Sequence, residues 1–481
     1  MSKYIFEKET ETPSNRSFDI ASVSRFGNTK NEPGKIEKHS YFVANRSGKF
    51  GLRLSIAFLI MYFILPPYFG IALPGFDLTI QRIGILAMLV YILAQKNRAA
   101  NFWREISNFP ALIFIFVFLA VLALTAVRRA HIGSVMYDTI EFIGLFLMLY
   151  IIKYELGLKK TIKTINLFGY VLGILGLIEY VMQRPLFLYL RTIKDMAAGV
   201  GIRAGTYRIM GPAVHSLGYG LMLIFMIAIA CVEIKENRID LFANPFLLVL
   251  LVTNAFLSGS RSALAVVGLE LVILFVFEDR ARKKKTILIG IILVAFLTLF
   301  VLATWGTSIS NYIMRQITSV IDTVFGTSFS VRFGANLTEL SNSSNYRRYL
   351  PRLFVSPWLS PLIGQGSGAS FYWYVDGFKI QSLDNFYVAE YFRFAYPGLI
   401  SYVVVLGTML GLMISSAIKR KSGLYICLIV GVACYLLNLW WVDTLQTIKY
   451  LYIVFAIYWS CETMVRAGEQ QKNGKEKISG N

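Results

Sequence analysis

Apolar runs of about 20 residues recur along almost the whole chain and constrain its fold more than any other feature. The hydrocarbon core of a bilayer is about 30 Å thick, so a helix needs roughly 20 apolar residues to cross it. The predicted spans are 52–73, 78–94, 109–127, 135–152, 163–182, 213–232, 241–258, 261–278, 286–305, 387–416, 422–439 and 447–464. The sequence therefore predicts an all-α polytopic membrane protein with about twelve transmembrane helices. The number is approximate because Pro66 and Pro67 interrupt the first segment and 241–278 is nearly continuous.

Composition supports this fold class and divides the chain into five parts. Hydrophobic residues make up 56% of the sequence and charged residues only 16%, against about 25% charged residues in soluble proteins. The predicted parts are a disordered cytoplasmic tail (1–50), helices one to nine (51–305), a large external loop before the tenth helix (306–386), helices ten to twelve (387–464) and a second cytoplasmic tail (465–481). The first 50 residues lack the apolar segment of a cleavable signal peptide.

The distribution of basic residues predicts the orientation of the helices. The net charge is +20, and Lys and Arg concentrate in alternate loops, as they do in loops that stay in the cytoplasm. The basic groups are the N-terminal tail, Lys96/Arg98/Arg104, Lys153/Lys159/Lys160/Lys163, Arg280/Arg282/Lys283/Lys284/Lys285, Lys419/Arg420/Lys421 and the C-terminal tail. All of them lie on one side if both termini are cytoplasmic. The basic surplus is thus a topology signal, and no nucleic-acid partner is expected.

Cysteine and histidine give no pattern typical of a metal or disulfide site. Cys231, Cys427, Cys434 and Cys461 all fall inside predicted spans, and the three histidines are far apart in the sequence. Structural zinc sites need four close ligands. The sequence therefore predicts no metal and no cofactor.

Ionisable residues also lie inside predicted spans and in external loops. Arg82, Glu141, Glu179, Glu390 and Arg393 are placed in the outer half of the membrane, where an unpaired charge costs on the order of 3 kcal/mol. Each is interpretable as half of a structural ion pair, and Glu390 and Arg393 are spaced to pair on one helix face. As a group, together with the external arginines, they favour a polar cavity that is open to the outside. The aromatic residues of the long loop fit either a packed cap or a platform for sugar rings or lipid.

Arginines facing outward limit the ligand that such a cavity would bind. The guanidinium group makes bidentate contacts with phosphate, but ATP and nucleotide sugars are not available outside the cytoplasmic membrane. A polyprenyl pyrophosphate needs no ATP, because its pyrophosphate is already a leaving group. Its lipid chain anchors it in the bilayer, from which it can reach the site. The competing interpretation is a phospholipid headgroup.

Three short stretches in external positions carry a resemblance to a known family. They are Arg208-x-x-Gly211, Ser258-Gly259-Ser260-Arg261, and Gly364-x-Gly366 followed by Asp384-Asn385. In this order and topology the chain, over about 200–415, resembles the O-antigen ligase-like superfamily. That superfamily contains O-antigen ligases and polymerases of lipid-linked repeat units. The histidine that precedes the asparagine in ligases is replaced here by Asp384, which favours a polymerase.

The resemblance implies a metal-independent inverting glycosyltransferase with a site assembled from these stretches. Arg208 and Arg261 would stabilise charge on the departing pyrophosphate, and Asp384 would act as the general base. The expected substrate-binding residues are Arg347, Arg348, Asn385, His215, Arg393 and Glu390. His215 is also the nearest alternative base, or a structural histidine at a helix start.

The expected function is polymerisation of polyprenyl-pyrophosphate-linked oligosaccharide repeat units for a surface polysaccharide: O-antigen, capsule or exopolysaccharide. The enzyme would lie in the bacterial cytoplasmic (inner) membrane with its site facing outside. Its partners would be the lipid-linked donor and acceptor and the lipid bilayer. A chain-length regulator is a possible further partner. The alternatives are an O-antigen ligase that transfers the glycan to a final acceptor and a flippase or transporter of lipid-linked oligosaccharides.

Overall fold

The structure is a computed structural model, and it describes residues 48–73, 76–129, 133–194, 201–203, 206–336 and 346–479. The tail predicted at 1–50 therefore lies outside the described residues, apart from its last three. Of these, Lys49 and Phe50 begin the first helix.

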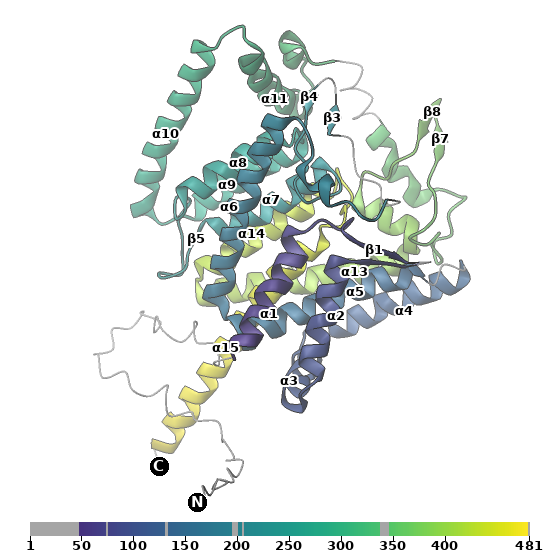
Figure 1. Cartoon of the computed structure of the whole chain (residues 1–481), viewed down its shortest axis with the longest axis vertical. Coiled ribbons are helices and arrows are strands. Elements are labelled where there is room, and N and C mark those ends of the chain that lie inside the picture. Colours follow the sequence, from purple (N-terminus) through teal and green to yellow (C-terminus); the bar gives the residue numbers. More distant parts are fainter. Residues whose placement is uncertain are drawn as a thin grey trace, which may run out of the picture. The chain divides into compact units, whose positions relative to one another are not determined.

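The described chain is mostly helical, which confirms the all-α prediction (Figure 1). The helices of the first half are α1 (Lys49–Leu59), α2 (Ile80–Leu93), α3 (Lys96–Ser107), α4 (Leu112–Arg128), α5 (Gly133–Tyr150) and α6 (Leu158–Met182). Wider π-helical turns extend α1 over Ile60–Ile64 and α5 over Ile151–Leu156. The helices of the second half are α7 (Ser216–Ala230), α8 (Pro245–Leu257), α9 (Arg261–Phe277), α10 (Arg280–Ala303), α11 (Ser308–Phe325), α13 (Phe386–Arg420), α14 (Gly423–Asn438) and α15 (Ile448–Ser479).

Each of the twelve predicted apolar segments contains a helix, but fewer helices are long enough to cross a membrane. By length and composition, four of the described helical segments qualify, namely Val135–Leu156, Leu158–Met182, Arg280–Ala303 and Phe386–Arg420. A fifth is obtained if α3 and α4, which meet at 87°, form one broken span. Helices α2, α7, α8 and α14 are apolar but shorter. These helices indicate a membrane protein, whereas the number twelve stays a prediction.

The first predicted span is wrong in its second half. The helix ends at Ile64, and Leu65 is extended with φ −84° and ψ 139°. Leu65 precedes Pro66, and a residue before proline is disfavoured in the helical region because it clashes with the proline ring. The chain then forms a hairpin of β1 (Gly70–Leu73) and β2 (Phe76–Thr79).

Three further two-stranded antiparallel hairpins lie in connections between helices. They are β3 (Ile202–Arg203) with β4 (Thr206–Tyr207), β5 (Val232–Glu233) with β6 (Arg238–Ile239), and β7 (Trp373–Val375) with β8 (Phe378–Ile380). All are too short to form a layer of their own, so the helices carry the fold.

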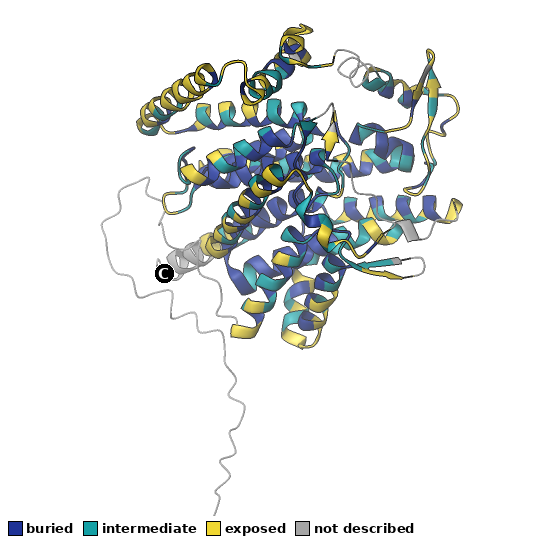
Figure 2. Ribbon diagram, turned by 45° about the horizontal axis from the view of Figure 1, so that its top comes forward, coloured by how far each residue is buried: buried dark blue, intermediate teal, exposed yellow. Residues whose placement is uncertain are grey.

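The core is built around α7, which is buried at every position except Leu217. A helix that is apolar on all sides requires neighbours on all sides, and α6, α8, α9, α14 and α15 surround this one. A second set of contacts joins α5 to α15 and α4 to α13. Figure 2 shows buried residues throughout these inner helices. The 346–385 part of the external loop packs onto α13 through a smaller apolar core that includes Leu350, Leu353 and Val388.

Helix α13 is broken near its N-terminal end, and the loop predicted to be external fills the break. Ala395 has φ 55° and ψ −165°, two residues before Pro397. The carbonyl groups of Phe392 and Arg393 accept hydrogen bonds from the backbone N–H groups of Gln365 and Gly366, both at 2.9 Å. A Cβ atom at Gly364 would lie only 2.0 Å from the Arg393 carbonyl oxygen. The Gly364-x-Gly366 element is therefore the segment that docks on this break.

Candidate functional site

A buried carboxylate fixes the turn that carries Arg208. Glu179 of α6 accepts hydrogen bonds from the Tyr207 hydroxyl at 3.1 Å, the Met210 N–H at 2.8 Å and the Gly211 N–H at 3.1 Å. Gly211 has φ +52°, and a Cβ atom there would lie 2.6 Å from the Tyr219 ring. Only glycine combines that backbone conformation with that close approach. The Arg208-x-x-Gly211 element is thus a rigid turn leading into α7.

Arg208 joins two of the stretches singled out in the sequence. Its side chain is only 5% exposed, and Nε donates to the Ser258 carbonyl at 2.9 Å. Gly259 has φ +61°, and a Cβ atom there would lie 2.9 Å from Arg208 Cγ. The Ser258–Arg261 stretch is therefore shaped to receive Arg208, and Ser260 then caps α9 by accepting from the Ala263 N–H at 3.3 Å.

Helix α11 from the predicted external loop lies over this junction. Thr323 of α11 accepts a hydrogen bond from Arg261 Nη1 at 3.4 Å, and Arg315 donates to the Thr206 hydroxyl. The Tyr312 hydroxyl interacts electrostatically with both Arg208 and Arg315. Arg208, Arg261 and Arg315 are called the arginine cluster below. The sequence gave no reason to select Arg315, because its neighbours are set by tertiary packing.

Asp384 forms a second group with residues of the external loop. Its Oδ2 atom accepts from Arg347 Nη2 at 2.7 Å and from the Tyr346 hydroxyl, and its Oδ1 atom accepts from the Ser382 hydroxyl. Burial opposes ionisation, but Arg347 and these hydrogen bonds outweigh it and hold the pKa of Asp384 below its usual value. Asp384 is therefore an anion that positions Arg347. Asp384, Arg347, Tyr346 and Ser382 are called the aspartate cluster.

The two arginines predicted beside Asp384 differ in environment. Arg347 is half-buried, and among the described residues its Nε atom is buried without a hydrogen-bond partner. Arg348 is exposed. Arg347 is therefore the better placed of the two to act together with Asp384.

Asn385 and His215 both cap helices. The side-chain oxygen of Asn385 accepts from the Val388 N–H at 3.1 Å, and its amide group donates to the Trp440 carbonyl at 2.9 Å. His215 Nδ1 accepts from the Leu217 N–H at 3.1 Å at the start of α7. The sequence analysis gave a structural histidine at a helix start as one interpretation of His215, and a helix cap is such a role.

Of the five charges predicted inside the spans, Glu390 and Arg393 pair with each other, and the others have different partners. Arg393 binds Glu390 at 3.1 Å, which confirms the predicted pair, and also binds Asp443 of the α14–α15 connection. Glu141 accepts from the Tyr62 hydroxyl at 2.9 Å and interacts electrostatically with Lys449. Glu179 is held by backbone N–H groups and a hydroxyl rather than by a cation, and Arg82 donates to the Asp77 carbonyl. Both carboxylate oxygens of Glu270 are buried without a hydrogen-bond partner among the described residues.

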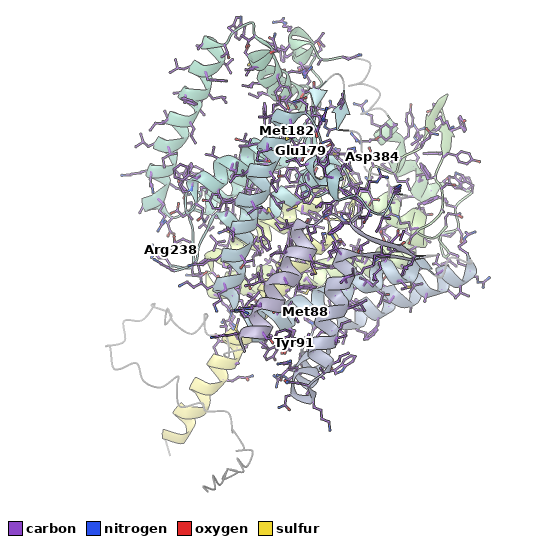
Figure 3. The ribbon with its side chains drawn as sticks, in the orientation of Figure 1. Met88, Tyr91, Glu179, Met182, Arg238 and Asp384 are labelled. Atoms are coloured by element: carbon purple, nitrogen blue, oxygen red, sulfur yellow. The ribbon has the colours of Figure 1, made fainter. Side chains whose placement is uncertain are left out.

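The connection 440–447 links the two halves of the predicted site. It holds Asn385 through Trp440 and Arg393 through Asp443, and Leu445 lies 3.3 Å from the position of a Cβ atom on Gly218 in α7. Leu445 and Gln446 both have positive φ, an arrangement that is rare for such side chains. Figure 3 places Glu179 and Asp384 in the same half of the molecule, away from Tyr91. Sequence reasoning missed this connection because it contains no recognisable motif.

Within the part of the chain that the structure describes, no group of three or more His, Cys, Asp or Glu side chains is placed to hold a metal ion. No model of a known protein family matches the chain, and no curated protein sequence matches it.

Proposed function

We propose that this protein is a membrane glycosyltransferase that polymerises polyprenyl-pyrophosphate-linked oligosaccharide repeat units on the outer face of the cytoplasmic membrane. The observation that carries the proposal is the junction of Arg208 with the Ser258–Arg261 stretch. Two separate sequence elements, each with an arginine suited to pyrophosphate, are held together there by Gly259 and Glu179.

The reaction would proceed by direct displacement. The acceptor hydroxyl attacks the anomeric carbon of the donor glycan, a new C–O bond forms, and the bond to the pyrophosphate breaks with inversion. The arginine cluster would stabilise the negative charge that develops on the departing lipid pyrophosphate. Asp384, ionised because of Arg347 and its hydrogen bonds, would accept the proton of the acceptor hydroxyl. A low pKa makes it a weak base, so electrostatic stabilisation of the leaving group supplies the larger share of the rate.

The ligase alternative uses the same chemistry with a different acceptor, and the replacement of the ligase histidine by Asp384 favours polymerisation. The transporter alternative is favoured less, because no internal repeat is visible in the sequence, although such repeats are common in transporters. Loss of the protein separates the three. We expect single repeat units on their usual acceptor or on lipid. Full-length polymer accumulating on the lipid carrier would identify a ligase, and repeat units trapped on the cytoplasmic leaflet would identify a flippase.

The proposed orientation is tested by single cysteines at two exposed positions, Ser328 after α11 and Lys419 near the end of α13. We expect an impermeant thiol reagent to label Ser328→Cys in intact cells and Lys419→Cys only after lysis. The unmodified chain is the control, because its four cysteines are all buried. Labelling of both variants in intact cells would overturn the orientation and with it the proposed location of the site.

A further inference from the structure

Helix α10 is attached to the rest of the chain only near its ends. All ten residues from Ile291 to Phe300 are exposed, although a helix packed on one face shows buried residues every three or four positions. The buried positions of α10 are Thr286 near one end and Val301 near the other. At its outer end, the Trp305 ring packs against Phe333 at 6.4 Å. Figures 1 and 2 show this helix standing apart from the other helices and exposed all around.

The middle of α10 nevertheless has a side that faces the protein. On a helix with 3.6 residues per turn, Leu293 and Leu297 lie on the same side as Thr286 and Val301. These two leucines are 41% and 42% exposed, whereas Ile292 and Leu299 on the opposite side are 57% and 66% exposed. Side chains of the described residues therefore do not fill the space on the inner side of α10.

The composition of α10 indicates what occupies that space. Helices that pack against other helices in membranes use small residues to bring the backbones together. The exposed stretch of α10 consists mainly of Ile, Leu, Val and Phe, and Gly290 has nothing within 4 Å of its Cβ position. The one hydroxyl within Ile291–Phe300, that of Thr298, donates to the Val294 carbonyl of the same helix. This surface suits hydrocarbon chains rather than a partner helix.

The space beside α10 leads to the arginine cluster. Helix α9, which begins with Arg261, ends at Phe277 only two residues before α10 begins. It presents its own apolar stripe of Leu269, Val272 and Val276, all exposed. Helix α11 follows α10 and returns to α9, where Thr323 binds Arg261. A hydrocarbon chain between α9 and α10 would thus have a cationic group at the end where its headgroup lies.

We infer that the space between α10 and the α9 side of the protein is the lateral binding site for the isoprenoid chain of the lipid-linked donor. The inference rests on the proposed function for the identity of the lipid. An anionic pyrophosphate at Arg261 distinguishes this lipid from the neutral acyl chains of the surrounding bilayer. The α10 helix is long enough, at 24 residues or about 36 Å, to accompany such a chain through the hydrocarbon core.

The test uses the full chain in nanodiscs with an isoprenoid pyrophosphate that carries no sugar and has a photoreactive group on its terminal isoprene unit. We expect labelled peptides from α9 and α10, with labelling competed by unlabelled isoprenoid pyrophosphate and not by phosphatidylglycerol. Leu297→Trp and Leu293→Trp should reduce labelling about tenfold, which corresponds to lost contact with about two methylene groups. Leu299→Trp makes the same change on the opposite side and should leave labelling unchanged.

Three outcomes would overturn the inference. Equal competition by phosphatidylglycerol would mean that bulk lipid fills the space. Equal effects of Leu297→Trp and Leu299→Trp would mean that no inner side exists. Cross-linking of α10 to α10 of a second copy would make this surface an interface between protomers. Transfer is assayed separately with a sugar-bearing donor, so specific labelling without transfer would refute the proposed function and leave the lipid site standing.

Discussion

Replacing Arg208 or Arg261 with alanine is expected to remove nearly all transferase activity. Loss of one preorganised donor to a developing negative charge costs roughly 3–4 kcal/mol, or about two to three orders of magnitude in rate. Lysine should restore only a small part, because it keeps the charge but loses the planar fork. At position 208 lysine also cannot reproduce the contact of Nε with the Ser258 carbonyl. The measurement is turnover of purified protein with a synthetic lipid-pyrophosphate donor, with and without a chelator.

Arg352 provides the matched control for this experiment. It lies in the predicted external loop 306–386 and is 59% exposed, and its ion pair with Asp376 lies at the surface. Exposed pairs contribute about 0–1 kcal/mol, so Arg352→Ala should retain near-normal turnover. If Arg208→Ala and Arg261→Ala behave like Arg352→Ala at equal expression, these arginines are structural and the proposed site is wrong.

Replacing Glu179 with alanine is expected to destabilise the protein more than any surface substitution. Two buried backbone N–H groups and one buried hydroxyl would lose their acceptor. Each unsatisfied buried group costs about 1–3 kcal/mol, and total stabilities are only about 5–15 kcal/mol. Glu179→Gln should lower stability less than Glu179→Ala, because it keeps one acceptor oxygen but turns an amide donor toward one of the three groups that need an acceptor. The measurement is the midpoint of thermal unfolding in detergent.

Glu236, which is exposed and forms surface ion pairs with Arg238 and Arg282, serves as the comparison. Glu236→Ala should leave the unfolding midpoint almost unchanged. An unfolding midpoint for Glu179→Ala equal to that of the unmodified chain would show that the 207–211 turn does not depend on this carboxylate. The rigid placement of Arg208 would then need another explanation.

The apolar segments were predictable because a helix needs a long run of apolar residues whether it is buried in a bilayer or in a protein core. Every predicted segment contains a helix, and the early end of the first one has a local cause at Pro66. At the other end of the chain, α15 continues to Ser479, well into the predicted C-terminal tail. Helix α11 was not predicted as a separate helix because Ser, Thr and charged residues interrupt its apolar positions, so that it contains no long apolar run. That amphipathic pattern in 308–325 was the available signal.

The candidate site was predictable only in its separate pieces. Gly259 and Gly211 are visible as glycines in short motifs, but the φ angles that require them depend on Arg208 and Tyr219 packing against them. The pair of Glu390 with Arg393 follows from spacing on one helix, whereas Asp443 is 50 residues further along and joins them only in three dimensions. Contacts between distant segments leave no periodic trace in a single sequence.

The break in α13 has a consequence for how this protein tolerates sequence change. The external loop is held there by backbone N–H groups of Gln365 and Gly366, so the attachment makes no demand on the side chain at position 365. Gly364 and Gly366 are the exceptions, since a side chain at 364 would collide with the Arg393 carbonyl and Gly366 has φ +86°. Neighbouring exposed positions such as Tyr372 and Tyr374 are free of that constraint. Substitutions at such exposed positions should therefore leave the attachment of the loop to Phe392 and Arg393 intact.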